Sequence, residues 1–316
     1  MRAHEAAHDN NATDNNATDD DASDDDASDD DDGGCDVTTT LLHVSDLHFG
    51  TVVDAALRGL EEVVATANPD AVIVTGDVTQ RGRGSELRGF VALLERLASR
   101  TVLVVPGNHD VDWWPPWRRV TAPLRRFQEQ VPAHNRRSVV VVNEVALLAL
   151  PSVDPWRQVA GTLSLAALQT LTSASATTTS AVRVAFTHHP LALDGPARRT
   201  HVLTNAPVAA VALANASIDL LLSGHIHIPF ATTTTAAFPD LPRAFVLAGA
   251  GTATSARTRG TQARSLQLLR VSSDRIEVER LEMPTQATAF VVVGSSVFVR
   301  PTGTAHWVFA KSGPGV

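Results

Sequence analysis

Side chains of the types that bind metal ions recur in this chain directly after short β-branched segments. Carboxylate, amide and imidazole groups follow five such segments, at Asp46, His48, Asp77, Asn108, His109, Asp110, His188, His189, His225 and His227. This mixed set of oxygen and nitrogen donors suits Mn, Fe, Zn, Co or Ni better than Ca or Mg. It has enough donors for two ions, and two ions about 3.5–4 Å apart can share a hydroxide and hold a phosphate for in-line displacement. A carboxylate can lie between two ions, and Asp77 is the candidate for that position.

These segments are predicted to be strands of a layered α/β domain, because they alternate with helical patterns. Ligands of open α/β sheets bind beyond the carboxyl ends of the strands, so the fold would bring the donors together although about 180 residues separate the first from the last. Strands are expected at 38–45, 71–75, 101–105, 138–142, 145–150, 182–187, 218–222 and 244–249. Gly76, Gly107 and Gly224 would let the chain turn sharply where strands end and backbone approaches a ligand.

Helices are expected between several of these strands, at 54–67, from Ser85 onward, and at 116–130, 163–173 and 207–215. Asp54 is the N-cap candidate of the first helix, and Asn68 followed by Pro69 should end it. Ser85 is expected to cap the second helix. After residue 264 the pattern changes to short β-rich segments, which predict the strands and hairpins of a second sheet.

Charge is distributed unevenly along the 316 residues, which have a formal net charge of −8. Residues 1–36 contain 14 of the 34 acidic residues and one of the 26 basic ones, in a repeated five-residue unit with few apolar groups. Such a segment is predicted to be a disordered acidic tail. We expect a catalytic domain over 37–263 and a β-rich C-terminal extension over 264–316 that belongs to the same domain, caps the site or forms a dimer edge.

Composition excludes several classes of protein. The single cysteine, Cys35, excludes an internal disulfide and a four-cysteine zinc site, and it favours a reducing compartment. The sequence shows no secretory signal, and the uncharged stretches 158–182 and 200–218 are too often interrupted by polar residues to span a membrane. The part after the tail is only slightly basic and lacks the stripe that nucleic-acid binding prefers. We therefore expect a cytoplasmic protein with no membrane or nucleic-acid partner.

Five short motifs occur in a particular order: D-x-H at 46–48, G-D at 76–77, G-N-H-D at 107–110, H-x-P at 188–190 and G-H-x-H at 224–227. Together they resemble the calcineurin-like metallophosphoesterase superfamily. The resemblance covers about residues 41–255. It implies two facing mixed β-sheets flanked by helices, with a dinuclear metal centre at the strand ends.

The resemblance also implies a role for each motif residue. Asp46, His48 and His227 would hold the first metal ion, Asn108, His188 and His225 the second, and Asp77 would bridge them. His109 would lie outside the metal ligands, contact the phosphate and stabilise or protonate the leaving oxygen. Asp110 would orient His109, since a carboxylate commonly fixes an imidazole tautomer.

The implied activity is hydrolysis of a small-molecule phosphate ester by a metal-bridging hydroxide that attacks phosphorus in line. Within the superfamily the motifs are most similar to the class III cyclic-nucleotide phosphodiesterase branch, so a diester such as a cyclic nucleotide is the leading substrate. A homodimer is compatible with the sequence. The alternatives are a phosphomonoesterase, a nucleotide pyrophosphatase, a nuclease and a non-catalytic metal-binding scaffold. The scaffold would be expected to lack a ligand, the bridge or His109, and the sequence has all of them.

Several nearby residues have two interpretations. His189 is either structural or faces the substrate and stays outside the predicted ligand set, whereas His43 is expected to be a packed or surface residue of its strand. Arg81 and Arg83 either reach a substrate phosphate or are solvated loop charges. The Trp- and Pro-rich segment 113–117 either packs as a loop or shapes the pocket mouth and stacks on a base.

Overall fold

A computed structural model describes residues 37–112, 116–157, 159–193, 201–258 and 260–314, and all structural statements here concern these residues. The acidic segment 1–36, predicted to be a disordered tail, lies outside them, as do Trp113 and Trp114. None of the helices within the described ranges is long and apolar enough to cross a membrane.

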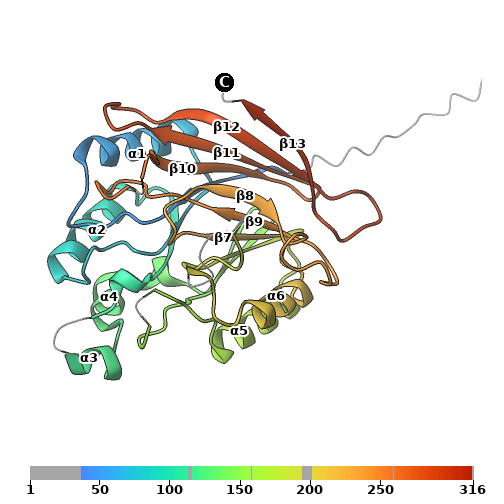
Figure 1. The fold of residues 1–316 in the computed structure, drawn as a ribbon, viewed down its shortest axis with the longest axis horizontal. Coiled ribbons are helices and arrows are strands. Elements are labelled where there is room, and N and C mark those ends of the chain that lie inside the picture. Colours follow the sequence, from blue (N-terminus) through green and yellow to red (C-terminus); the bar gives the residue numbers. More distant parts are fainter. Residues whose placement is uncertain (1–36, 113–115, 158, 194–200, 259, 315–316) are drawn as a thin grey trace, which may run out of the picture. The chain divides into compact units, whose positions relative to one another are not determined.

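The strands form two mixed β-sheets, as the resemblance implies (Figure 1). The first sheet has the order β13-β12-β11-β10-β1-β2-β3, in which β1, β2 and β3 are parallel and the other neighbours are antiparallel. Its strands are β1 (Thr39–Val44), β2 (Ala71–Thr75), β3 (Thr101–Val105), β10 (Arg264–Val271), β11 (Arg275–Met283), β12 (Val291–Val299) and β13 (Val308–Pro314).

The second sheet has the order β4-β5-β6-β7-β9-β8, with a parallel centre from β5 to β9 and an antiparallel strand at each edge. Its strands are β4 (Val139–Val142), β5 (Val145–Ala149), β6 (Val182–Phe186), β7 (Leu220–Ser223), β8 (Phe230–Thr233) and β9 (Val246–Gly249). The helices are α1 (Asp54–Ala67), α2 (Gly84–Arg96), α3 (Pro116–Thr121), α4 (Arg125–Gln130), α5 (Leu165–Thr177) and α6 (Ala206–Asn215).

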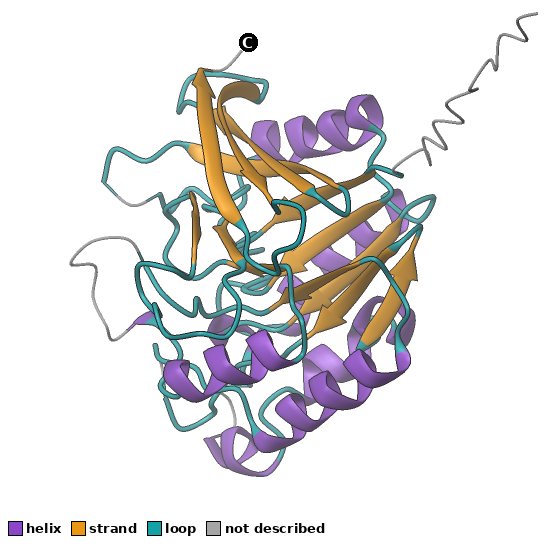
Figure 2. Ribbon diagram, turned by 90° about the vertical axis from the view of Figure 1, so that its right-hand side faces the viewer, coloured by secondary structure: helices purple, strands orange, loops and turns teal. Residues whose placement is uncertain are grey.

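The two sheets face each other, and helices cover both outer faces (Figure 2). Side chains alternate between the two faces of a strand, so Leu41 of β1 packs against the second sheet whereas Leu42 packs against α1 and α2. Phe186 of β6 lies between the sheets, and its neighbour Ala185 faces α5 and α6. Because both faces are covered, the central strands are apolar almost throughout. This four-layer arrangement fixes the carboxyl ends of the parallel strands at one edge.

The C-terminal strands differ from the sequence-based expectation of a second sheet. β10 runs antiparallel to β1, with Leu269 opposite Leu41, so β10 to β13 extend the first sheet. Two of the short β-rich segments predicted after residue 264, at 288–294 and 296–301, form the single strand β12, and β8 and β13 were not predicted. The predicted helix 116–130 is two helices, since Pro123, which lacks a backbone N–H, lies in the break between α3 and α4.

The helix ends agree with the prediction in part. Asn68 adopts the left-handed conformation, with φ 47°, and ends α1 as expected. Asp54 is the first helical residue, and Val53, without a side-chain cap, precedes it. Ser85 is the second residue of α2 rather than its cap; instead, the carboxylate of Glu86 accepts hydrogen bonds from the backbone N–H groups of the preceding loop, which holds that loop against the helix.

Candidate metal centre

The predicted ligands lie at the carboxyl ends of five strands. Those after β1, β2 and β3 belong to three parallel neighbours of the first sheet, and those after β6 and β7 to two parallel neighbours of the second. Asn108 and His109 form a short 3₁₀ turn, Asn108–Asp110, directly after β3. The facing sheets therefore bring side chains from distant parts of the sequence to one place, as expected because ligands of α/β sheets bind beyond the carboxyl ends of the strands.

The first group of donors consists of Asp46, His48 and His227. Oδ1 of Asp46 lies 3.0 Å from Nε2 of His227 and 3.7 Å from Nε2 of His48, and the two Nε2 atoms lie 3.2 Å apart. All three residues are buried. The donors are close enough to surround a single cation.

A second group lies on the other side of Asp77. Oδ1 of Asp77 is 3.4 Å from Nε2 of His188, which is itself 3.1 Å from Oδ1 of Asn108. Oδ2 of Asp77 is 3.9 Å from Nε2 of His48 in the first group. Asp77 thus presents one oxygen to each group, which is the position the sequence predicts for a bridging carboxylate.

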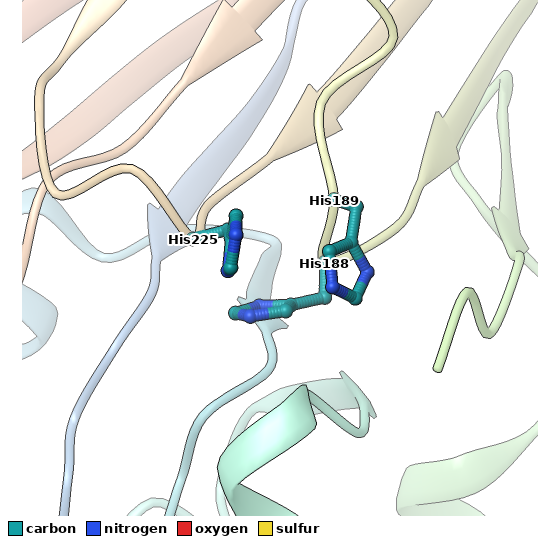
Figure 3. A group of neighbouring side chains, drawn as sticks. All are labelled: His188, His189 and His225. Carbon is teal, nitrogen blue, oxygen red and sulfur yellow. The ribbon is translucent and has the colours of Figure 1, made fainter. Parts of the chain in front are cut away.

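His225 and His189 lie beside His188, and Figure 3 shows the three rings gathered from the segments that follow β6 and β7. The ring centroids of His188 and His225 are 5.1 Å apart. Nε2 of His225 lies 3.2 Å from Nδ1 of His201, a histidine that the sequence analysis missed because no motif surrounds it. His189 is buried with Nδ1 2.8 Å from Oγ of Ser152, and it could join His188 and His225 around a cation.

Backbone carbonyl groups orient three of the imidazoles. Nδ1 of His188, His227 and His48 lies 2.7, 3.2 and 3.3 Å from a carbonyl oxygen, respectively. A carbonyl oxygen only accepts, so each Nδ1 must carry the proton and each Nε2 of a neutral ring must present its lone pair. Metal-binding histidines are commonly held in this way.

This arrangement fits a metal ion. With both Nδ1 atoms protonated, the Nε2 atoms of His48 and His227 direct lone pairs at each other across 3.2 Å. Oδ1 of Asp46 is also buried and has no hydrogen-bond donor within the described ranges. Buried acceptors left without a donor are unfavourable, and a cation between these three atoms would satisfy all of them.

The electrostatics favour the protonation states that metal ligands need at four of the candidate ligands, and His188 is the exception. Burial alone would raise the pKa of Asp46 and Asp77, but the facing imidazoles hold both values below the usual range. Burial lowers the pKa of His48 to about 4 and that of His225 to about 3. Burial also favours the neutral ring of His188, but the Asp77 carboxylate outweighs it and raises the pKa of His188 to about 9. Metal binding at the second group would therefore release a proton.

The backbone is strained at the donors. Five candidate ligands have positive φ: Asp46 at 53°, His48 at 49°, Asp77 at 48°, His225 at 72° and His227 at 58°. Only three other non-glycine residues in the described part of the chain share this conformation. It is uncommon for residues with a Cβ, and strain of about 1–3 kcal/mol per residue is often stored at functional sites. The folded chain therefore holds these side chains in directions that an ordinary loop would not give them.

Glycines allow the motif segments to approach each other closely. A Cβ on Gly107 would overlap Oδ1 of Asp77, and one on Gly224 would overlap Oγ of Ser45 and lie 2.8 Å from Oδ2 of Asp46. Of the three glycines predicted to allow sharp turns, only Gly76 has a positive φ, 87°. At Gly107 the requirement is space for the Asp77 carboxylate, and at Gly224 it is space for Ser45 and Asp46.

The His109 ring lies beside that of His48, and Asp110 does not orient it. Nδ1 of His109 is 2.7 Å from the backbone oxygen of Gln80, and its backbone N–H donates to Asp77. The buried Asp110 carboxylate instead accepts hydrogen bonds from Thr79 Oγ1 and from three backbone N–H groups. Burial, and then Asp77, raise the pKa of Asp110 to about 6. The predicted role of Asp110 is wrong: it joins the loop after β2 to the turn after β3.

A cleft of about 710 Å³ opens onto both groups of donors. His109 lines it, together with Arg81, Arg83, Arg126 and Arg257. The Trp- and Pro-rich segment 113–117, which either packs as a loop or shapes the pocket mouth, is described only from residue 116 onward, and Trp117 is exposed on α3.

Comparison with known proteins agrees with this geometry. The family model for calcineurin-like phosphoesterases matches residues 39–229, and the chain belongs to that family. Enzymes of the family depend on two metal ions, and this chain is a metal-dependent phosphoesterase. A search of curated proteins finds no match.

Solved structures share the fold. A purple acid phosphatase from yellow lupin (Lupinus luteus) superposes with a TM-score of 0.60 at 13% identity, over 84% of this chain and 55% of that one, so the chain spans little more than half of the lupin enzyme. PhoD gives a TM-score of 0.64 at 13% identity, over 88% and 72% of the two chains. A dimetal phosphatase from Danio rerio gives 0.53 at 14% identity, over 76% and 95%.

Replacing Gly107 with Ala should reduce phosphoesterase activity about 100-fold, because the new Cβ displaces the Asp77 carboxylate and a shift of about 1 Å at a reacting centre has an effect of that size. Hydrolysis of bis(p-nitrophenyl) phosphate with Mn²⁺ measures this. Gly294→Ala in β12 is the matched control, since the nearest atom lies 3.5 Å from its Cβ. Full activity of Gly107→Ala would contradict the requirement for this close approach.

Proposed function

We propose that the chain is a phosphodiesterase that acts at two metal ions bridged by Asp77. The observation that carries the proposal is the position of Asp77, whose two oxygens face separate groups of donors. The first ion would be held by Asp46, His48 and His227, and the second by Asn108, His188 and His225. The donor set suits Mn, Fe, Zn, Co or Ni.

When bound, the two ions would lower the pKa of a water molecule and neutralise charge on the phosphate during in-line displacement. The protein's own contribution is positioning. Carbonyl groups direct the Nε2 lone pairs of three histidines, and strained backbone directs the carboxylates, so little reorganisation is needed when substrate binds.

His109 is proposed to act on the leaving group. Its Nδ1–H is held by the Gln80 carbonyl, so the proton that a protonated ring can give up is the one on Nε2. Transfer of that proton to the leaving oxygen would produce the alcohol without charge build-up. Asp77 holds the backbone of His109 through a 2.8 Å hydrogen bond and so couples the position of the acid to the metal centre.

The preference for a diester, including a cyclic nucleotide, is supported by the motifs, and the cleft of about 710 Å³ has space for the organic part of such a substrate. A phosphomonoesterase or nucleotide pyrophosphatase activity of the same centre is the alternative. We also propose that residues 37–263 and 264–316 act as one catalytic domain, which the pairing of β10 with β1 supports. We further propose that β13, with the exposed Phe309, offers an edge for a homodimer. The protein is proposed to work in the cytoplasm on small-molecule substrates.

Comparison of cyclic AMP, bis(p-nitrophenyl) phosphate, p-nitrophenyl phosphate and a nucleotide sugar, with Mn²⁺ supplied, tests the proposed reaction. We expect the two diesters to have the highest kcat/KM. A higher value for the monoester or for the nucleotide sugar would assign the enzyme to the corresponding alternative. No hydrolysis of any compound by the metal-loaded protein would indicate the scaffold.

His109→Ala should retain the metal content of the unchanged protein and lower kcat for bis(p-nitrophenyl) phosphate by about 10²–10⁴-fold, the usual contribution of a general acid. His134→Ala, at an exposed histidine that does not line the cleft, should leave kcat unchanged. Loss of metal from His109→Ala would show that His109 is a ligand.

A further inference from the structure

Arginines gather at one side of the cleft. Arg81 and Arg83 come from the loop between β2 and α2, and Arg257 comes from the segment that precedes β10. All three also line a smaller hollow of about 530 Å³ that shares Gln80 with the cleft, so the two spaces are adjacent. None of the candidate metal ligands lines the hollow, and three arginines do.

The backbone next to these arginines is tied to the site. The carbonyl of Arg257 lies 3.2 Å from Nδ1 of His227, and the carbonyl of Gln80, the residue before Arg81, lies 2.7 Å from Nδ1 of His109. The backbone that carries Arg257 therefore contacts a candidate ligand, and the backbone next to Arg81 contacts the candidate acid.

The loop that carries Arg81 and Arg83 is rigidly held. Its backbone N–H groups donate to Glu86 at 2.8 and 3.3 Å. Between the arginines, the buried Gly82 donates to Thr79 Oγ1 at 3.0 Å. Gly82 has φ +62° and lies against the backbone of Val111, which leaves no space for a side chain. The two arginines are thus presented by an ordered turn.

Within the described ranges, none of the three guanidinium groups has an ion pair. Glu86 also lines the hollow, but its carboxylate is engaged by the backbone of the loop. In contrast, Arg126 at the same cleft is paired with Asp112. Three exposed, unpaired arginines around one hollow, with one carboxylate, create a local excess of positive charge that attracts anions.

We propose that Arg81, Arg83 and Arg257 form a subsite for a second anionic group of the substrate, a phosphate carried on the part of the diester that keeps the hydrolysed phosphate. Guanidinium groups bind phosphate through paired N–H donors, which suits them to this role. The inference rests on the proposed phosphodiesterase function and adds to it a preference for phosphate diesters that carry an additional phosphate.

A pair of substrates tests the subsite: thymidine 5′-(p-nitrophenyl phosphate) and the same compound with a 3′-phosphate, both of which release p-nitrophenol. With Mn²⁺ at low salt, the 3′-phosphate should raise kcat/KM of the unchanged protein by about tenfold, chiefly through KM. In a variant with Arg81→Gln, Arg83→Gln and Arg257→Gln, the ratio of the two kcat/KM values should fall to about one. Salt should reduce the ratio for the unchanged protein.

Arg137→Gln is the matched control, because Arg137 is exposed and does not line the cleft or the hollow, and it should keep the full ratio. Equal kcat/KM for both substrates in the unchanged protein would overturn the subsite and leave the phosphodiesterase standing. An equal loss for both substrates in the triple variant would also overturn it, by showing that the arginines bind the phosphate that is cleaved. If neither substrate nor bis(p-nitrophenyl) phosphate is hydrolysed, the proposed function itself fails.

Discussion

The whole site depends on holding several electron-pair donors, carboxylates and imidazoles, close together and away from water. Two buried carboxylates and several imidazole lone pairs lie close together, and Nε2 of His48 is only 3.2 Å from Nε2 of His227. Such a cluster is unfavourable without positive charge at its centre. The rest of the fold supplies rigidity: facing sheets, strained ligand backbone and glycines that leave room for carboxylates.

The four-layer architecture explains how this rigidity is obtained. Parallel strands from both sheets end at the same edge, and apolar packing on both faces keeps them there. The C-terminal strands continue the first sheet beside β1, the strand that leads to Asp46. Asp110 adds hydrogen bonds, because its buried carboxylate accepts from both the loop after β2 and the turn after β3. The strands that carry the candidate metal ligands are therefore also the strands whose packing stabilises the fold.

Local patterns in the sequence predicted much of this. The central strands and the motif residues at their ends are found close to the expected positions, because apolar runs and glycine-flanked donors are local signals. The partner of β10 was missed, since alternation indicates a strand but not its neighbour. The role of Asp110 was missed because successive residues of a tight turn point in different directions, and His201 reaches His225 only through tertiary folding.

Metal analysis of the purified protein decides whether the centre is dinuclear and bridged. Mass spectrometric metal content after loading with Mn²⁺ and removal of free ions should give about two ions per chain for the unchanged protein. Asp77→Ala should bind neither ion stably and should lose hydrolysis with them, because Asp77 faces both groups of donors. Two retained ions and full hydrolysis in Asp77→Ala would contradict the bridge.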